Sequence, residues 1–146
     1  KMRNAKNFQA GLQLLRQLEL SLFDFRLHLE FDPKKDYTQI QALLDKIRKR
    51  INIIPVSPFN RFQHGFSHIF AGGYAAGYYS YLWAEVLSCD AFTKFLEDGI
   101  FNQETGQAFL QSILEQGGAI DAMELFKKFR GREPKIQAFL KSLDIE

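Results

Sequence analysis

The residues best suited to chemistry lie in one stretch of the 146-residue chain, from His68 to Glu85. Four of the five tyrosines, the single tryptophan and three of the ten glycines fall within it. Glycine lets a backbone turn sharply, and each tyrosine ends in a hydroxyl that can donate or accept a hydrogen bond. The composition predicts a mobile loop that presents phenols and a histidine to a bound ligand.

A second candidate is the pair His64 and His68, which stand four residues apart. On a helix this spacing puts both rings on one face, as in the zinc motif His-Glu-x-x-His. Gly65 occupies the position of the motif's glutamate, and neither His28 nor any of the scattered carboxylates is singled out as a third ligand. We therefore expect no self-contained zinc site and assign no metal ligand in this chain.

The glycines Gly72, Gly73 and Gly77 resemble a phosphate-binding loop only loosely. The Lys-Ser/Thr pair of such a loop is missing, and no strand is predicted before the glycines. We therefore do not interpret these glycines as a phosphate site.

Glu85 lies seven and four residues after Tyr78 and Tyr81, so on a helix all three side chains project to one side. Two interpretations remain open from this spacing. The glutamate is either buried and held by tyrosine hydroxyls, or part of a polar wall for a peptide or another polar ligand.

The overall composition is that of a soluble globular protein, with 46% hydrophobic and 25% charged residues. A net charge of +2 gives no reason to expect nucleic acid or an anionic membrane as a partner, and no apolar run approaches the roughly 20 residues that span a bilayer. The basic residues from Lys46 to Arg50 alternate with isoleucine, which indicates a solvated helix face. The single cysteine, Cys89, is expected to be a small buried side chain in a protein of a reducing compartment.

The apolar spacing and the stop signals predict an all-α fold of about six helices in one domain over residues 1–146. Asp32-Pro33, Gly99 and Gly131 mark helix ends, and Asp121 marks a start. An aromatic-rich connection is expected over residues 53–70. The first helix is apolar on two sides, so we expect it to pack between neighbours. The predicted helices cover residues 5–31, 36–51, 78–98, 102–115, 121–131 and 134–143.

The segment from His68 to Leu87 resembles the signature segment of the thimet oligopeptidase family, in its bacterial branch. Three further segments resemble that branch in the same order: residues 5–10, residues 15–19 with 23–28, and the Phe-Arg-Gly-Arg-Glu-Pro run at residues 129–134. The resemblance covers essentially the whole chain.

The resemblance implies a zinc metallopeptidase that is mostly helical, with a zincin-like catalytic region that cleaves short peptides. In this family the zinc is held by a His-Glu-x-x-His helix and a downstream glutamate, none of which occurs here. The chain also begins at Lys1 within helical sequence. We therefore expect the C-terminal portion of a longer enzyme, with zinc as cofactor of the parent and none in this fragment.

The resemblance also gives the loop residues their roles. Tyr81 and His68 are implied as catalytic, with Tyr81 donating a hydrogen bond to the oxyanion of the attacked peptide. Tyr74, Tyr78, Gly72 and Gly73 are implied on the substrate side, and the glycines as hinges. Tyr79 and Trp83 are expected to pack into the core.

These expectations define two functions of different classes. The first is the substrate-binding part of a cytoplasmic zinc oligopeptidase, inactive as an isolated chain. Its partners would be short peptides and the missing N-terminal, zinc-binding part, and the fragment could self-associate. The alternative is a non-catalytic helical module that binds peptides or a partner helix.

Overall fold

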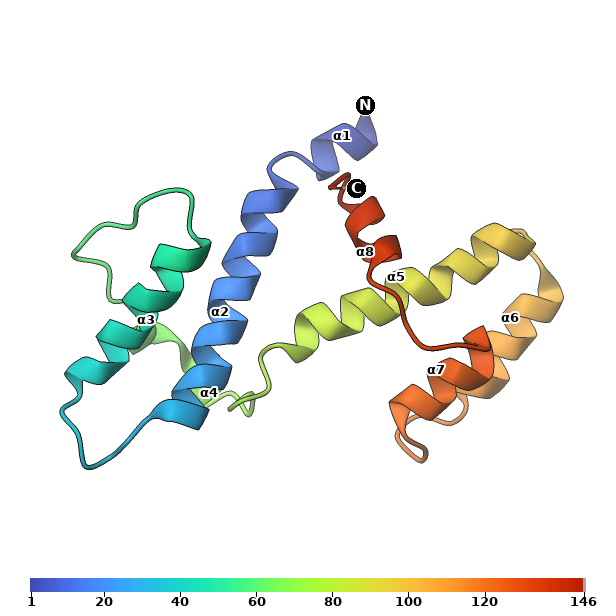
Figure 1. Ribbon diagram of the computed structural model, residues 1–146. Helices are drawn as coiled ribbons and strands as arrows, with labels where there is room; N and C mark the ends of the chain where they lie inside the picture. The colour runs from blue at the N-terminus through green and yellow to red at the C-terminus, as the bar shows by residue number, and fades with distance from the viewer. Residues whose placement is uncertain (146) are drawn as a thin grey trace. The chain divides into compact units, whose positions relative to one another are not determined.

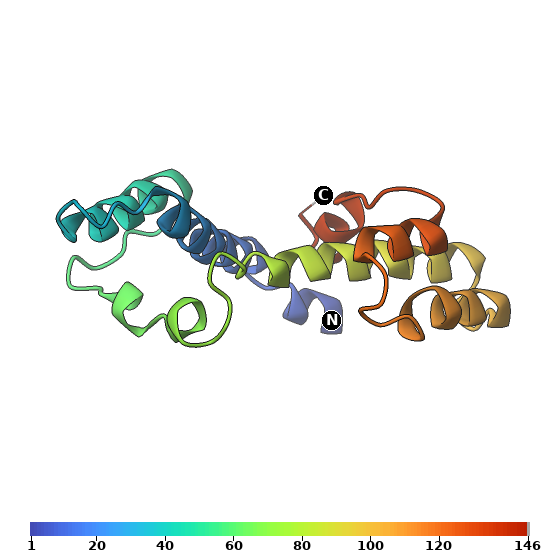
Figure 2. The ribbon, with the colours of Figure 1, turned by 90° about the horizontal axis from the view of Figure 1, so that it is seen from below.

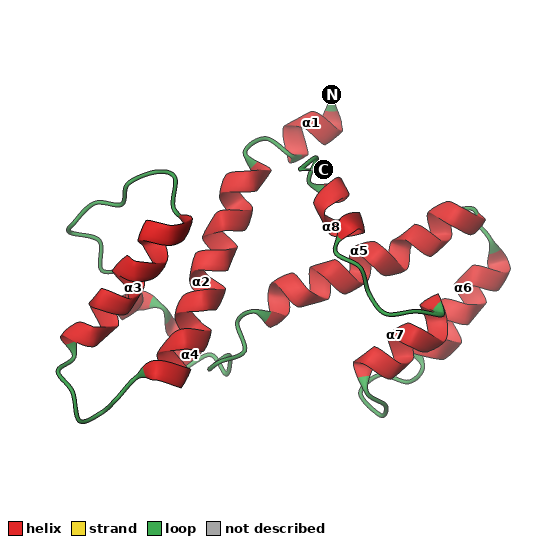
Figure 3. Ribbon diagram, viewed as in Figure 1, coloured by secondary structure: helices red, strands yellow, loops and turns green. Residues whose placement is uncertain are grey.

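The computed structural model describes residues 1–145, except the side chain of residue 3. Every regular element in this part of the chain is helical, which confirms the all-α prediction (Figure 3). The elements are α1 (Met2–Lys6), α2 (Ala10–Glu30), α3 (Thr38–Ile51), a 3-10 turn (Phe62–Gly65), α4 (Ser67–Phe70), α5 (Ser80–Asp98), α6 (Gln103–Phe109), a π-helical turn (Leu110–Leu114), α7 (Ala122–Arg130) and α8 (Gln137–Ser142).

The chain divides into two compact units, which we call unit 1 (residues 1–82) and unit 2 (residues 83–146). The boundary falls within the first turn of α5. The expectation of one domain over residues 1–146 stays a prediction.

Unit 1 is built around α2 and α3, which lie side by side (Figures 1 and 2). Apolar residues of these helices pack with Phe66 and Ile69 of the following segment and with Tyr78. The buried set from α2 and α3 is Leu20, Phe23, Leu27, Leu44 and Ile47. The segment that carries His68 is thus anchored to the core on both sides of the histidine.

The long first helix is interrupted, contrary to the prediction of one helix over residues 5–31. Gln9 adopts a left-handed conformation with φ of 56°, which separates α1 from α2. A left-handed residue cannot continue a right-handed helix. Only one of the two apolar sides of α2 is buried: Phe23 and Leu27 lie in the core, whereas Leu22, Phe25 and Leu29 of the other side are exposed.

The basic run of α3 is only partly solvated. Lys46, Lys49 and Arg50 are exposed as expected, but Arg48 is buried. Its Nε lies 2.9 Å from Oε1 of the buried Glu19. The prediction of a solvated face was wrong for Arg48, because it rested on neighbouring residues and the ion-pair partner lies 29 residues away.

Unit 2 has an aromatic core between α5, α6 and α7, in which Phe95, Phe109 and Phe129 contact one another. Its helix ends follow the sequence signals. Asp121 caps α7 by accepting from two backbone N–H groups, and Gly131 ends it in a left-handed conformation with φ of 72°. The predicted helix over residues 102–115 is present, but its second half is a π-helical turn.

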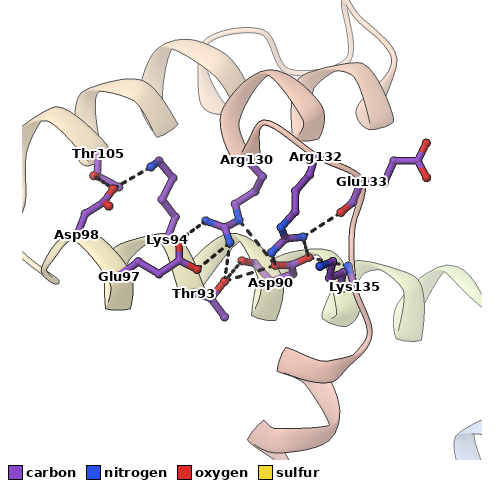
Figure 4. A network of polar contacts seen from close by, with 10 residues as sticks. All are labelled: Asp90, Thr93, Lys94, Glu97, Asp98, Thr105, Arg130, Arg132, Glu133 and Lys135. Carbon is purple, nitrogen blue, oxygen red and sulfur yellow. Dashed lines mark hydrogen bonds and ion pairs between the residues drawn. The ribbon is translucent and has the colours of Figure 1, made fainter.

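A polar network joins α5 to the segment that follows α7 (Figure 4). The buried Asp90 accepts two hydrogen bonds from Arg132 and one, of 2.6 Å, from the backbone N–H of Lys135. These bonds hold residues 131–136 as a non-helical linker. The last helix therefore starts at Gln137, later than Pro134 indicated.

Candidate functional site

His68, Tyr74, Tyr78 and Tyr81 form one aromatic cluster within unit 1. The histidine lies on α4, Tyr74 and Tyr78 on the loop of residues 71–79, and Tyr81 in the first turn of α5. The ring of His68 lies 6.2 Å from that of Tyr74, 5.7 Å from Tyr78 and 6.5 Å from Tyr81. The structure thus brings together the four side chains to which the sequence assigns a role.

The rings of Tyr74 and Tyr81 lie closest, with centroids 4.9 Å apart. A hydrogen bond with Tyr74, together with desolvation and the neighbouring phenols, raises the pKa of Tyr81 to about 12. A pKa this high keeps the hydroxyl of Tyr81 protonated at neutral pH. Tyr81 is 41% exposed, and a protonated phenol can donate a hydrogen bond.

Tyr78 is the buried member of the cluster. Its side chain is 9% exposed, burial raises its pKa, and its hydroxyl donates to Oε1 of Gln17 at 3.1 Å. Its ring packs 5.1 Å from that of Tyr81. Here Tyr78 supports its neighbours, and its predicted contact with substrate stays a prediction.

Gly72 and Gly73 shape the turn between α4 and the tyrosines. A Cβ atom on Gly72 would lie 2.8 Å from the Cα of His68 and 2.9 Å from its carbonyl oxygen, a distance that real side chains do not adopt. Gly73 has φ of 80°, which favours glycine. Gly72 therefore permits close packing against His68, and the proposed hinge role of both residues stays a prediction.

The buried carboxylate of Asp24 holds the same loop from the side of α2. Its Oδ1 accepts from the backbone N–H of Ala76, and its Oδ2 from that of Tyr78, each at 2.9 Å. Nδ1 of His28 lies 2.9 Å from Oδ1. Asp24 was not predicted from the sequence. Its position next to Phe23 and three residues before Leu27 is a signal, because an acid on the apolar side of a helix is buried only with hydrogen-bond donors around it.

The described residues do not supply a metal site. No group of three histidine, cysteine or carboxylate side chains in this part of the chain is placed to hold an ion. His64 lies in the 3-10 turn and His68 on α4, while His28 contacts Asp24. The described residues therefore do not provide a set of zinc ligands.

Three residues next to the cluster differ from expectation. Tyr79 and Trp83 were expected in the core, but they are 49% and 44% exposed. The ring of Tyr79 packs edge-on against Phe25, which is itself exposed. Glu85 is also exposed, so the interpretation as a buried glutamate is wrong. The interpretation as a polar wall remains open.

Two further properties bear on the kind of protein. Among the described residues no helix is long and apolar enough to cross a membrane. Cys89 is partly buried, with its sulfur 3.7 Å from Oγ of Ser142. A partly buried thiol against a hydroxyl agrees with the expectation of a packing residue.

Comparison with known proteins agrees with the assignment made from the loop. The model of peptidase family M3 matches residues 1–145. Oligopeptidase A of Salmonella typhimurium is 57% identical over 146 residues, which are all of this chain and 21% of that protein. Oligopeptidase A of Escherichia coli is 58% identical over the same shares. The probable cytosolic oligopeptidase A of Arabidopsis thaliana is 44% identical over 97% of this chain and 20% of its own length.

The chain thus spans about a fifth of the length of these curated relatives. The match extends over both units and includes the loop, the Asp24 region and the Phe-Arg-Gly-Arg-Glu-Pro run. The resemblance seen in the sequence is confirmed, and the chain belongs to peptidase family M3.

Proposed function

We propose that this chain supplies the substrate-binding and oxyanion-stabilising part of a zinc-dependent oligopeptidase that hydrolyses short peptides. One observation carries the proposal: His68, Tyr74 and Tyr81 converge in one cluster on a loop whose sequence matches oligopeptidases. The cluster presents a protonated phenol and an imidazole on one partly exposed surface. These are the groups that bind a peptide backbone and stabilise a negatively charged oxygen.

Tyr81 is the proposed oxyanion donor. When water adds to a peptide carbonyl, the carbonyl oxygen gains negative charge, and a hydrogen bond aimed at that oxygen stabilises the transition state by about 3 to 4 kcal/mol. With a pKa of about 12, the Tyr81 hydroxyl keeps its proton at neutral pH. In this proposal the substrate oxygen accepts a hydrogen bond from the Tyr81 hydroxyl, which takes the place of the bond between Tyr81 and Tyr74.

The neighbouring groups have supporting roles in this proposal. His68 is placed to hydrogen-bond the reacting peptide unit, and Tyr74 to contact the substrate backbone. Tyr78 joins them through its ring, and Gly72 and Gly73 allow the loop to approach a peptide closely. The roles of all these residues are assigned by proximity to Tyr81 and by family membership.

Zinc in this proposal is held outside the residues described here. Family membership implies a zinc enzyme, but the described side chains offer no suitable ligand set. The ligands would come from the remaining part of the longer enzyme, which is also the proposed partner of this chain. When bound, the metal would supply Lewis-acid chemistry and an activated water.

The test is Tyr81→Phe in the longer enzyme, with Tyr79→Phe as the matched control. Tyr81→Phe removes one hydroxyl and should lower the turnover of a short peptide by about 10²-fold or more, with zinc content unchanged. Tyr79 is an exposed tyrosine outside the cluster, so Tyr79→Phe should keep normal turnover. Normal turnover of Tyr81→Phe would remove Tyr81 from the mechanism.

The isolated chain provides a second test. We propose that it neither binds zinc stoichiometrically nor hydrolyses peptides, and that it dimerises through the exposed apolar side of α2. Peptidase activity with bound zinc in the purified chain would overturn this part of the proposal.

We also propose a cytoplasmic location, in keeping with the relative named as a probable cytosolic enzyme.

A further inference from the structure

The carboxylate of Asp24 connects the core of unit 1 to the functional loop. The side chain is fully buried on α2, and each of its two oxygens accepts one backbone N–H from the loop. The donors, Ala76 and Tyr78, flank Gly77 and lie 52 and 54 residues away in the chain. A carboxylate offers a separate oxygen to each of the two donors, whereas a hydroxyl or an amide has one oxygen.

The loop needs such a restraint because its backbone is unfavourable at the point of contact. Ala76 has φ of 53°, in the left-handed region that alanine rarely occupies. A residue in this conformation persists only where its surroundings hold it. One of the two N–H groups that Asp24 binds belongs to this same alanine, so the carboxylate holds the turn at its strained residue.

The restraint is transmitted directly to the aromatic cluster. Tyr78 receives the second bond from Asp24, and its ring packs 5.7 Å from His68 and 5.1 Å from Tyr81. Its carbonyl accepts from the backbone N–H of Tyr81 at 3.3 Å. A shift of the Tyr78 backbone would therefore move both side chains proposed as catalytic.

Other groups of α2 support the same contact. Gln17 lies two helical turns before Asp24 and accepts from the Tyr78 hydroxyl, and His28 lies one turn after it against Oδ1. No lysine or arginine within the described residues forms an ion pair with this carboxylate. The bonds of Asp24 are thus directed at the loop and not at a permanent cation.

We propose that Asp24 is a positioning residue of the peptidase, which holds the turn Ala76–Tyr78 so that Tyr81 and His68 face the bound peptide. This inference rests on the function proposed above. It adds a residue that does not touch substrate and acts through the loop.

The experiment uses the longer enzyme and the variant Asp24→Asn. Asparagine keeps the size of the side chain, but it turns an NH2 group toward one of the two backbone donors. A displaced catalytic group costs about 10²-fold in rate for about 1 Å, so we expect kcat to fall by at least about 10-fold. The KM of the peptide should change much less than kcat, because the displaced donor acts in the transition state.

A double-mutant cycle separates positioning from general structural damage. Because Asp24 positions both Tyr81 and His68, Asp24→Asn should lower kcat by a smaller factor in a Tyr81→Phe background than in the unaltered enzyme. Multiplication of the two single effects would overturn the proposal. The matched control is Glu19→Gln, which changes another buried acid of α2 that binds Arg48 and not the loop. It should leave kcat of the folded enzyme near the normal value.

A measurement on the unaltered enzyme keeps the proposal testable if Asp24→Asn does not fold. The amides of Ala76 and Tyr78 lie outside any helix, but they should exchange slowly with solvent because Asp24 binds them. Rapid exchange over residues 74–79 would overturn the proposal. Loss of activity in Tyr81→Phe together with normal kcat in Asp24→Asn would overturn this inference alone, whereas normal activity of Tyr81→Phe would overturn the proposed function.

Discussion

Each unit contains one fully buried aspartate that ties a long helix to a distant loop, and the two differ in what they bind. In unit 1, Asp24 of α2 accepts from two backbone N–H groups and contacts His28. In unit 2, Asp90 of α5 accepts from the guanidinium of Arg132 and from one backbone N–H, that of Lys135. Both side chains are at most 1% exposed.

This difference indicates that Asp24 shapes a loop, whereas Asp90 stabilises the fold of unit 2. Backbone donors fix the path of the chain residue by residue, and the Asp24 loop carries the aromatic cluster. Guanidinium groups instead compensate the charge of a buried carboxylate over several bonds, and Asp90 is in addition 3.7 Å from Nε of the buried Arg130. We therefore expect changes at Asp90 to affect mainly stability and changes at Asp24 to affect mainly activity.

The largest expected effect is the loss of stability in Asp90→Ala. Removing one partner of a buried ion pair leaves uncompensated charge, which costs about 3 to 5 kcal/mol. Hydrogen exchange at increasing urea, measured on peptides from residues 83–145, reports the local free energy of unfolding in unit 2.

The control for Asp90→Ala is Glu97→Gln. Glu97 also binds Arg130 through two hydrogen bonds, but its side chain is 56% exposed. An exposed pair contributes about 1 kcal/mol or less. Equal losses of stability in Asp90→Ala and Glu97→Gln would show that burial does not set the strength of this network.

Much of the fold could be predicted from the sequence because its signals are local. The start of α7 at Asp121 and its end at Gly131 depend on side-chain and backbone preferences within a few residues. The interruption at Gln9 was missed because no glycine or proline marks it. Burial of Arg48 was missed because its partner, Glu19, lies on another helix.

The candidate site divides in the same way. Composition and family resemblance identified His68, Tyr74 and Tyr81, since these residues are gathered in one segment. Their mutual approach depends on hydrogen bonds to Asp24 from more than 50 residues away, which no local spacing encodes. The exposed ring of Tyr79 was misassigned for a related reason, because the sequence does not show which aromatic side chains of the segment are covered by distant residues.

A smaller effect is expected from Gly72→Ala in unit 1. The added methyl group would meet the backbone of His68 at 2.8 Å, and such overpacking costs about 1 to 3 kcal/mol. Gly77→Ala is the control in the same loop, since its nearest neighbour would be at an ordinary 3.6 Å. Hydrogen exchange over residues 66–82 measures both variants.

In unit 2 the comparable glycine is Gly131, with open space around it and φ of 72°. Alanine there should cost about 1 to 2 kcal/mol through backbone strain alone.

If Gly72→Ala is tolerated as well as Gly77→Ala, the tight packing of α4 against the loop is not a requirement of the fold.

The smallest expected effect is the change in the stability of unit 2 that the titration of Asp90 causes on acidification. Burial raises the pKa of this carboxyl, but hydrogen bonds from Arg132 and Lys135 and the nearby guanidinium charges outweigh burial and leave the pKa below its ordinary value. Because the folded pKa lies below the unfolded value of about 3.9, unfolding takes up a proton in acid. The contribution of Asp90 is therefore complete above about pH 5 and is lost as the pH falls through the folded pKa.

Asp90→Asn removes this titration, so the stability of unit 2 should be lower at neutral pH and fall less steeply with acid. The remaining slope would come from exposed acids such as Glu97, whose pKa a hydrogen bond from Arg130 lowers. The measurement is hydrogen exchange of residues 83–145 between about pH 3 and pH 6, corrected for the intrinsic pH dependence of exchange. An unchanged slope in Asp90→Asn would show that folding does not lower the pKa of Asp90, and the contrast with Asp24 would then rest on geometry alone.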